Sequence, residues 1–494
     1  MNHEAVMVAG WGQVTQPKES SPPYLEPLDL MVDATRQAAS QAGRDALRKV
    51  DALFVVRPQS RDLRDAPAQL ARRLGITPKV TRLSGIGGQV PQQLVNQAAG
   101  MLARGEVESV LVCGAETYYP RAADSVRGEL GLLQGIPADY AADDATGSNA
   151  LEQRHGLTLP IHGFPLFENA LWAESGLDRA QWLAKVGALW SSFSEIAARH
   201  PNAWTRKPLS AADIVTPGPD NRPICYPYTK RMVSLVMADL GAAVLLTRAG
   251  QAASSRDGGG TPVYFLGGAF ARDRQRFPIE RSSFTRSSAM AQAFARTWQR
   301  TGLGPDDVEG FDLYSCFPCA VTLARRELGL AETDPRPLTR TGGLGFFGGP
   351  GSNYALHGIA TVAEEIGRGV LGTGMATALG WFVHKYAVGV YGKFPGSTDL
   401  RQFAHEDETN PDAGPAPEHF ADAGEGEGTV ETWTVLHDRD QQPTQALIYG
   451  RQVNGLRFVA NGAPDEVPAW TGENRVGQRL RLECRNGLTL ARLA

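Results

Sequence analysis

Two segments of the chain carry side chains that are able to do chemistry. The first is the run YSCFPC at residues 314–319, which combines a phenol with two thiols, and the second holds Tyr354 and His357. Phenols, thiols and imidazoles exchange protons, and a thiolate is also a nucleophile. Tyr314, Cys316, Tyr354 and His357 are therefore the candidate catalytic residues.

The two cysteines of the first segment, Cys316 and Cys319, form a C-x-x-C pair. A zinc site needs a second pair or a nearby histidine at the right spacing, and neither follows, so we expect no metal site. Redox activity needs a thioredoxin-like helix start, and Pro318 alone is a weak signal for one. A pocket thiol at a strand end and a buried cysteine without chemistry are equally good interpretations of Cys316.

One glycine-rich turn occurs twice in the chain. The first copy is RLSGIGGQVPQQLVNQAAG at residues 82–100, and the second is RTGGLGFFGGPGSNYALHGIA at residues 340–360. Each copy leads from polar sequence into a helix-like apolar pattern. Backbone N–H groups at such a helix start converge on a negative group placed there. Both turns are therefore suited to hold an anionic or strongly polarised ligand.

The elements around these turns repeat as well. An apolar strand VDALFVV at residues 50–56 corresponds to VEGFDLY at 308–314, and further strands follow the turns at 107–116 and 371–380. Strands that alternate with helices predict a parallel α/β sheet. The same order in both halves predicts an internal duplication.

The chain divides into three predicted domains. Residues 1–250 form the first α/β half, with a helical, tryptophan-rich insertion at 164–228, and residues 260–398 form the second half. An acidic stretch rich in glycine and proline at 405–428 predicts a linker. Residues 428–494 alternate apolar and polar residues and contain the turn signals Asn454-Gly455 and Asn486-Gly487. This pattern predicts a small all-β, barrel-like domain of the oligonucleotide/oligosaccharide-binding (OB) type.

Composition excludes several classes of function. The 494 residues are 42% hydrophobic and 21% charged with a net charge of −4, so bulk charge does not favour nucleic acid or an anionic membrane. No stretch reaches about 18 uninterrupted apolar residues, which predicts no membrane insertion. Five irregularly spaced cysteines predict no disulfide framework and favour the cytoplasm.

The duplicated unit, the insertion and five segments together resemble the thiolase superfamily. The segments are, in chain order, VLVCGAE, PLFENALWAESG, DLGAAVLLT, YSCF and GGLGFFGGPG. The match covers roughly residues 1–395 in order, and the additional β domain is similar to that of thiolase-like proteins, which are often named acetyl-CoA acetyltransferases. The resemblance implies a duplicated αβαβα fold, a pocket for coenzyme A or acyl-CoA, and a role in acyl-CoA or lipid metabolism.

The resemblance also implies where catalytic residues belong. Thiolases carry a nucleophilic cysteine in the first turn, where Gly87 stands, or Gly88 if the alignment shifts by one. The histidine that binds the thioester oxygen in the second turn is matched by Gly349, and a last cysteine by Gly380. The chain is thus expected to lack the standard Cys/His/Cys residues and normal thiolase turnover.

The fourth catalytic motif of the family is His-Asp-Cys-Phe in thiolases of the sterol carrier protein type. Its place is taken by Tyr-Ser-Cys-Phe, so that Cys316 matches the acid/base cysteine and Tyr314 replaces the histidine. Some thiolase-fold aldolases of steroid side-chain breakdown work without the nucleophilic cysteine and have a partner with a β-barrel domain. Paired tyrosines such as Tyr314 and Tyr354 suit their proton transfers on acyl-CoA thioesters.

Three functions remain open: an acyltransferase homologue that binds acyl-CoA, an aldolase or lyase, and a non-catalytic subunit that binds a protein partner through the β domain. The residues do not decide whether the protein is an enzyme.

The resemblance places Lys230, Arg231 and Ser234 near the pantetheine arm, and the turn glycines Gly87, Gly88 and Gly349 in the ligand cradle. Coenzyme A or acyl-CoA is expected as a ligand, no cofactor as a tightly bound group, and a monomer or a homodimer as the assembly.

Overall fold

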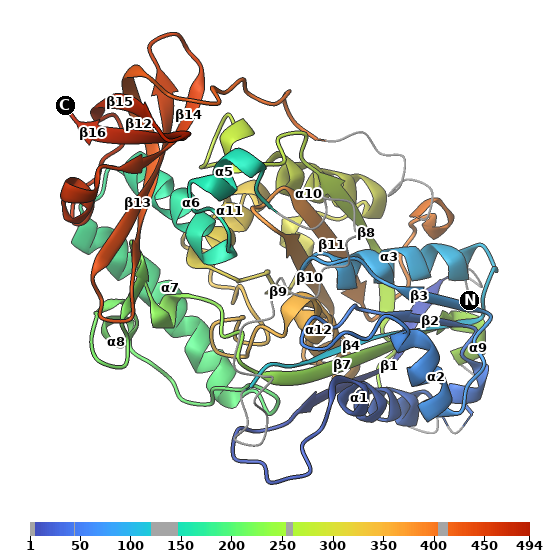
Figure 1. Ribbon diagram of the computed structural model, residues 1–494. Coiled ribbons are helices and arrows are strands. Elements are labelled where there is room, and N and C mark those ends of the chain that lie inside the picture. Colours follow the sequence, from blue (N-terminus) through green and yellow to red (C-terminus); the bar gives the residue numbers. More distant parts are fainter. Residues whose placement is uncertain (1–4, 44, 120–146, 253–259, 404–412) are drawn as a thin grey trace.

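The computed structural model describes residues 5–43, 45–119, 147–252, 260–403 and 413–494 (Figure 1). Within them, one nine-stranded sheet has the strand order β3-β2-β4-β7-β1-β8-β11-β10-β9. The strands of its first half are β1 (Val6–Thr15), β2 (Ala52–Val55), β3 (Val80–Leu83), β4 (Ser109–Thr117) and β7 (Asp239–Arg248). Those of its second half are β8 (Tyr264–Arg272), β9 (Gly310–Asp312), β10 (Thr373–Gly380) and β11 (Lys385–Gly392).

The sheet repeats one arrangement on either side of its middle. The first strands of the two halves, β1 and β8, pair with each other in antiparallel fashion. Outward from them lie β7, β4 and β2 on one side and β11, β10 and β9 on the other. In both halves the first two of these strands are antiparallel to each other, and the next pair is parallel. The predicted duplicated α/β fold is therefore confirmed.

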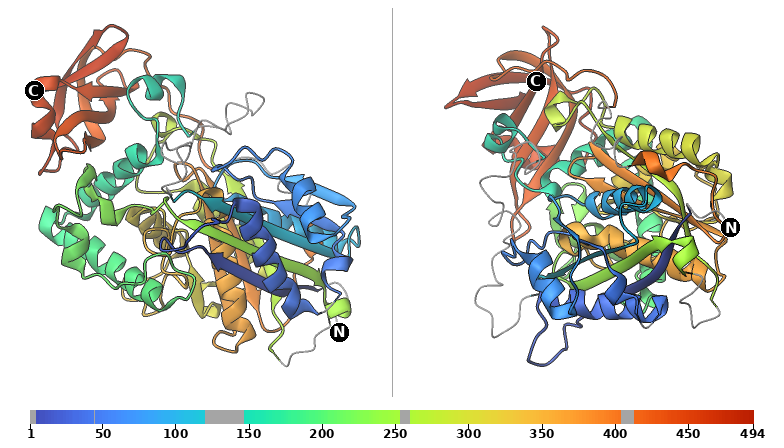
Figure 2. Two further views of the ribbon diagram at one scale, coloured as in Figure 1. Left: turned by 60° about the horizontal axis from the view of Figure 1, so that its bottom comes forward. Right: turned by 90° about the vertical axis from the view of Figure 1, so that its right-hand side faces the viewer.

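Two helices form the centre of the fold. They are α3 (Val90–Ala103) and α12 (Tyr354–Gly367), which contact each other and strands from both halves of the sheet. α12 is buried on nearly all sides, as its apolar sequence requires. The outer helices are α1 (Pro27–Ala42), α2 (Ala66–Leu74), α10 (Ser288–Thr301) and α11 (Pro318–Leu328), and a short α9 (Ala249–Ala252) follows β7 (Figure 2). Each of these helices directly follows one of the glycine-rich turns. Both turns therefore end at the centre of the molecule.

Four helices of the described residues follow β4 in the chain and precede β7. They are α5 (Ala150–Arg154), α6 (Pro160–Ser175), α7 (Arg179–Arg199) and α8 (Ala211–Val215). α7 begins with a capping box in which the side chain of Asp178 accepts a hydrogen bond from the N–H of Gln181. A short hairpin follows, β5 (Pro223–Cys225) and β6 (Tyr228–Thr229), and it pairs with the sheet of the C-terminal domain. The sequence pattern does not predict this shared sheet.

The C-terminal domain is a closed barrel. Its five strands are β12 (Gly426–His437), β13 (Pro443–Gln452), β14 (Arg457–Gly462), β15 (Arg479–Arg485) and β16 (Leu488–Leu493). They follow the order β13-β14-β16-β15-β12, and a β12–β13 pairing closes the ring. Trp433 and Trp470 are fully buried. The predicted all-β barrel is confirmed, with its predicted turns between β13 and β14 and between β15 and β16.

The barrel is attached to the α5–α7 side of the body, away from the N-terminal end (Figure 1). Asn169 of α6 donates to the carbonyl of Trp433 at 2.7 Å. The fully buried His155 accepts a hydrogen bond at Nε2 from the N–H of Thr489 at 3.0 Å, and Tyr449 donates to Glu152 at 3.0 Å. These bonds join buried groups of both domains, so the barrel has a defined position on the body.

Candidate active site

The first glycine-rich turn and the end of β10 face one side chain. A Cβ atom placed ideally on Gly87 would lie 2.2 Å from Oε1 of Gln89, and one on Gly380 would lie 2.1 Å from the same oxygen. The N–H of Gly87 donates to the hydroxyl of Ser352 in the second turn, at 2.9 Å. Two glycines nearly 300 residues apart in the sequence therefore face one point between the turns, which is filled by the amide of Gln89.

Gly88 lies against Tyr314. An ideal Cβ on Gly88 would lie 2.2 Å from the Tyr314 hydroxyl oxygen and 2.4 Å from the carbonyl oxygen of Leu379. Tyr314 is 5% exposed, and its ring packs edge-on against that of Tyr354 with centroids 5.5 Å apart. Burial raises the pKa of the Tyr314 phenol, so the hydroxyl keeps its proton near neutral pH. Tyr314 thus carries a neutral hydroxyl, which can donate a hydrogen bond, beside the first turn.

Tyr354 is held by a network below the second turn. Its hydroxyl lies 2.6 Å from the hydroxyl of Thr341 and 3.4 Å from Oδ2 of Asp312, which ends β9. The other oxygen of Asp312 accepts hydrogen bonds from the Thr339 hydroxyl at 2.9 Å and from the N–H groups of Arg340 and Thr341 at 2.8 and 3.0 Å. The carboxylate of Asp312 therefore fixes the start of the turn. The Tyr354 hydroxyl is hydrogen-bonded within the same network, to Thr341 and Asp312.

Cys316 and Gly349 lie near Ser234. The Ser234 hydroxyl donates to the carbonyl of Cys316 at 2.7 Å, and its Cβ lies 3.6 Å from an ideal Cβ on Gly349. An added Cβ on Gly349 would touch nothing closer than 3.4 Å, unlike one on Gly87 or Gly88. Burial raises the pKa of the Cys316 thiol, which is the direction opposite to nucleophile activation.

His357 lies one helical turn after Tyr354 on α12 and its ring faces β1. Its Nδ1 is 2.9 Å from Oε1 of Gln13 on β1, and its buried Nε2 has no hydrogen-bond partner among the described residues. Burial, with a smaller contribution from the nearby His200, lowers the pKa of His357 to about 3. The ring of Phe347 packs against both His357 and Tyr354. His357 is therefore a neutral imidazole that contacts β1.

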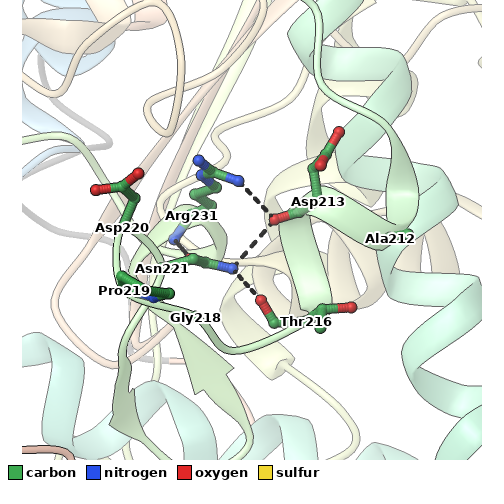
Figure 3. Close-up of a pocket in the computed structure, with 8 residues that line it drawn as sticks. All are labelled: Ala212, Asp213, Thr216, Gly218, Pro219, Asp220, Asn221 and Arg231. Atoms are coloured by element: carbon green, nitrogen blue, oxygen red, sulfur yellow. Dashed lines mark hydrogen bonds between the residues drawn. The ribbon is translucent and has the colours of Figure 1, made fainter.

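The two predicted cation contacts, Lys230 and Arg231, lie just after the insertion, in the short 3-10 helix Lys230–Met232 that follows β6. Lys230 is exposed, and Arg231 lines a hollow of about 370 Å³ together with Asp213, Asp220 and Asn221 (Figure 3). The Arg231 guanidinium donates to the carbonyl of Asp213 at 2.9 Å. This hollow has two carboxylates against one guanidinium, so its own charge does not favour a phosphate.

The structure thus brings Tyr314, Tyr354, Gly87 and Gly88 together, and Ser234, Cys316 and Gly349 beside each other. Gln89, whose amide oxygen lies between Gly87 and Gly380, is not among the site residues predicted from the sequence. Among the described residues, no group of His, Cys, Asp or Glu side chains could hold a metal ion. Nor does any helix in these ranges have the length and apolar character needed to cross a membrane.

Comparisons with known proteins agree with this architecture. Residues 410–485 match the family model of the thiolase-like protein type 1 additional C-terminal domain. Over the whole length of both chains, the structure is similar to a monomeric SCP2-thiolase like protein type 1 from Mycobacterium smegmatis, with 29% identity and a TM-score of 0.82. No curated protein matches the sequence.

Two more distant structures share the fold. The Ltp2-ChsH2(DUF35) aldolase is 21% identical with a TM-score of 0.62, and 80% of this chain and 99% of that chain are covered. An acetyl-CoA acetyltransferase from Syntrophomonas wolfei is 14% identical with a TM-score of 0.55, and the coverage is 79% and 99%. The structure therefore has the fold of these thiolase-like proteins over its whole length, and its C-terminal part matches the additional domain of thiolase-like proteins of type 1.

Proposed function

We propose that this protein binds coenzyme A and acyl-CoA thioesters in a thiolase-type cradle and does not carry out the thiolase reaction. The observation that carries the proposal is the convergence of Gly87 and Gly380 on Oε1 of Gln89. In thiolases the corresponding positions hold two cysteines that act on one acyl group. A shared point between them supports a retained ligand site, and glycine at both positions supports the loss of its nucleophiles.

The remaining thiol does not compensate for these glycines. Cys316 is buried and its pKa is raised, so it is a neutral thiol near pH 7 and a poor nucleophile. Gly349 stands where the resemblance places the histidine that binds the thioester oxygen in thiolases, and a Cβ added there would make only ordinary contacts. Binding without turnover is consistent with both facts, because a cradle built from the backbone does not depend on these side chains.

The test is to measure binding and turnover separately. Titration calorimetry with coenzyme A and acetyl-CoA is expected to give saturable binding, and incubation with acetoacetyl-CoA and coenzyme A is expected to give no thiolysis. Absence of binding for both ligands contradicts the first half of the proposal. Thiolysis that depends on the protein contradicts the second half.

An aldolase or lyase acting on acyl-CoA thioesters is the second candidate function. It is favoured by the edge-on pair of Tyr314 and Tyr354, with the Tyr314 hydroxyl beside Gly88. A phenol that keeps its proton at this point can donate a hydrogen bond to a carbonyl oxygen and polarise it. If a retro-aldol activity is found, Tyr314→Phe should reduce it at least tenfold, and an unchanged rate refutes this function.

For the barrel we propose an OB-type fold with a structural role. OB domains bind oligonucleotides and oligosaccharides on the face of their second and third strands, which correspond to β13 and β14. On these strands Tyr449 and Asn461 donate hydrogen bonds to Glu152 and to the carbonyl of His155 in the body. With that face covered, nucleic acid is not expected as a ligand. By analogy with the monomeric relative, we expect a monomer, which light scattering can test.

A further inference from the structure

A hollow of about 420 Å³ lies at the junction of the body and the barrel, and no candidate catalytic residue lines it. The body contributes α6 and the loop at 282–285, and the barrel contributes β12, β14 and the loop at 476–477. The apolar part of its wall consists of Ala170, Ala173, Phe284, Val430 and Val476. A mainly apolar wall with a few polar groups is typical of sites for small molecules.

The polar part of the wall contains a fully buried guanidinium. Arg457 of β14 lines the hollow and is 1% exposed. Its Nη2 forms an ion pair with Glu431 at 2.7 Å, but Nε and Nη1 have no hydrogen-bond partner among the described residues. A buried donor without a partner costs about 1–3 kcal/mol, and such atoms are rare in folded proteins. Arg457 therefore has hydrogen bonds left to donate.

The guanidinium is held where it is by its surroundings. It lies over the ring of Phe284, 5.3 Å from the centroid. The backbone N–H of Arg457 donates to the carbonyl of His419 at 3.0 Å, and its carbonyl accepts from the N–H of Ala421 at 2.8 Å. Because both the backbone and the guanidinium are fixed, the acceptor for its remaining donors has to come from outside these contacts.

The two carboxylates of the hollow, Glu431 and Glu174, each have a cation of their own. Glu431 pairs with Arg457 and also with Nε of Arg451, at 3.2 Å. Glu174 pairs with Arg326 at 2.5 Å. No net charge is left to attract an ion, and an added anion would lie beside two glutamates. The unmatched donors therefore favour a neutral ligand that carries a carbonyl oxygen.

We propose that this hollow binds a small carboxamide with a short aliphatic chain. The amide carbonyl accepts a hydrogen bond from Arg457, the amide N–H donates to the carboxylate of Glu431, and the chain lies against the apolar wall. The pairing is non-covalent. The inference does not depend on the proposed function, because the hollow and the acyl-CoA cradle have no residue in common.

The test uses three probes of the same chain length and different charge: pentanamide, pentanoate and pentylamine. Titrations followed by ligand-observed NMR measure their dissociation constants for the full-length protein. Pentanamide is expected to bind with a Kd of about 1–10 mM, which is ordinary for a ligand of this size. Pentanoate and protonated pentylamine should bind at least about tenfold more weakly, because each brings an unmatched charge into the hollow.

Two variants separate the donors of Arg457 from the general shape of the hollow. Arg457→Met removes the donors and keeps an unbranched side chain, so pentanamide binding should weaken about tenfold. Arg451→Met is the matched control, because Arg451 pairs with the same Glu431 but is not part of the wall, and it should change the affinity by less than about twofold. Ala173→Leu fills the hollow from α6 and removes no polar group, so it should abolish binding even if Arg457→Met does not fold.

Three outcomes overturn the proposal. They are no binding of pentanamide to the wild type, pentanamide binding that is unchanged in Arg457→Met or in Ala173→Leu, and tighter binding of pentanoate than of pentanamide, which would make the hollow an anion site. None of them bears on the proposed function, which is tested with coenzyme A and acetyl-CoA.

Discussion

Adding one methyl group to Gly88 should destabilise the protein far more than adding one to Gly349. An ideal Cβ on Gly88 would lie 2.2 Å from the Tyr314 hydroxyl oxygen and 2.4 Å from the carbonyl oxygen of Leu379. The side chain can rotate or shift, but the carbonyl belongs to a strand of the central sheet and cannot move without distorting it. We expect Gly88→Ala to cost about 2–3 kcal/mol, the upper part of the range for an overpacked core.

Gly349→Ala is the matched control in the second turn. The nearest atom to its ideal Cβ is 3.4 Å away, an ordinary contact. We expect a change of about 0.5 kcal/mol or less. The double variant Gly88→Ala with Tyr314→Phe should recover only part of the loss, because removal of the hydroxyl leaves the contact with the carbonyl of Leu379.

Equilibrium unfolding in urea, followed by tryptophan fluorescence, measures these differences as shifts in midpoint at constant slope. Acetyl-CoA binding to Gly88→Ala should also weaken, since the turn that carries Gln89 must shift. A Gly88→Ala protein as stable as the wild type would refute the packing of Tyr314 against the first turn. So would complete recovery of stability in the double variant.

Three further predictions concern titratable groups. Burial raises the pKa of Glu152 to about 7 from an ordinary value of 4.5. Its contribution to the free energy of unfolding is therefore complete below about pH 4.5 and is lost as the pH rises through 7. Glu152→Gln should therefore flatten the fall in melting temperature between pH 5 and 8, and an unchanged slope would contradict this. His357→Asn should cost about 1–3 kcal/mol through its bond with Gln13 but leave acetyl-CoA affinity unchanged in calorimetry; a tenfold loss would place His357 in the ligand site. Cys484, the one cysteine that is not buried, should react first with Ellman's reagent, and Cys484→Ser should abolish the fast phase; a fast phase that survives in this variant would show that a buried thiol is open to solvent.

The sequence predicts much of the fold because its signals are local and repeated. The strands at 50–56 and 308–314 and the turns before α3 and α12 recur in the same order, so the duplication can be recognised without coordinates. The Asn454-Gly455 and Asn486-Gly487 turns likewise predict the hairpins of the barrel. The pairing of β5 with β12 is not predictable, because Cys225 and Leu436 are far apart in sequence and share no local pattern.

The candidate site is predictable only in part. The strand-end motif contains Tyr314 and the second turn segment contains Tyr354, and the two tyrosines do pack against each other. The orientation of a helical side chain depends on its neighbours, so the contact of His357 with Gln13 of β1 could not be foreseen. The position of the Gln89 amide depends on a side chain that turns back over Gly87, and no spacing in the sequence encodes that.

The central claim is that an acyl-CoA cradle persists where the thiolase nucleophiles are absent. Titration of acetyl-CoA into the wild-type protein, with the acetyl-CoA and coenzyme A in the cell quantified afterwards, tests it most directly. The account predicts saturable binding at one site per chain, with the thioester recovered intact. A titration without saturable heat, or release of coenzyme A in proportion to the protein, would contradict it.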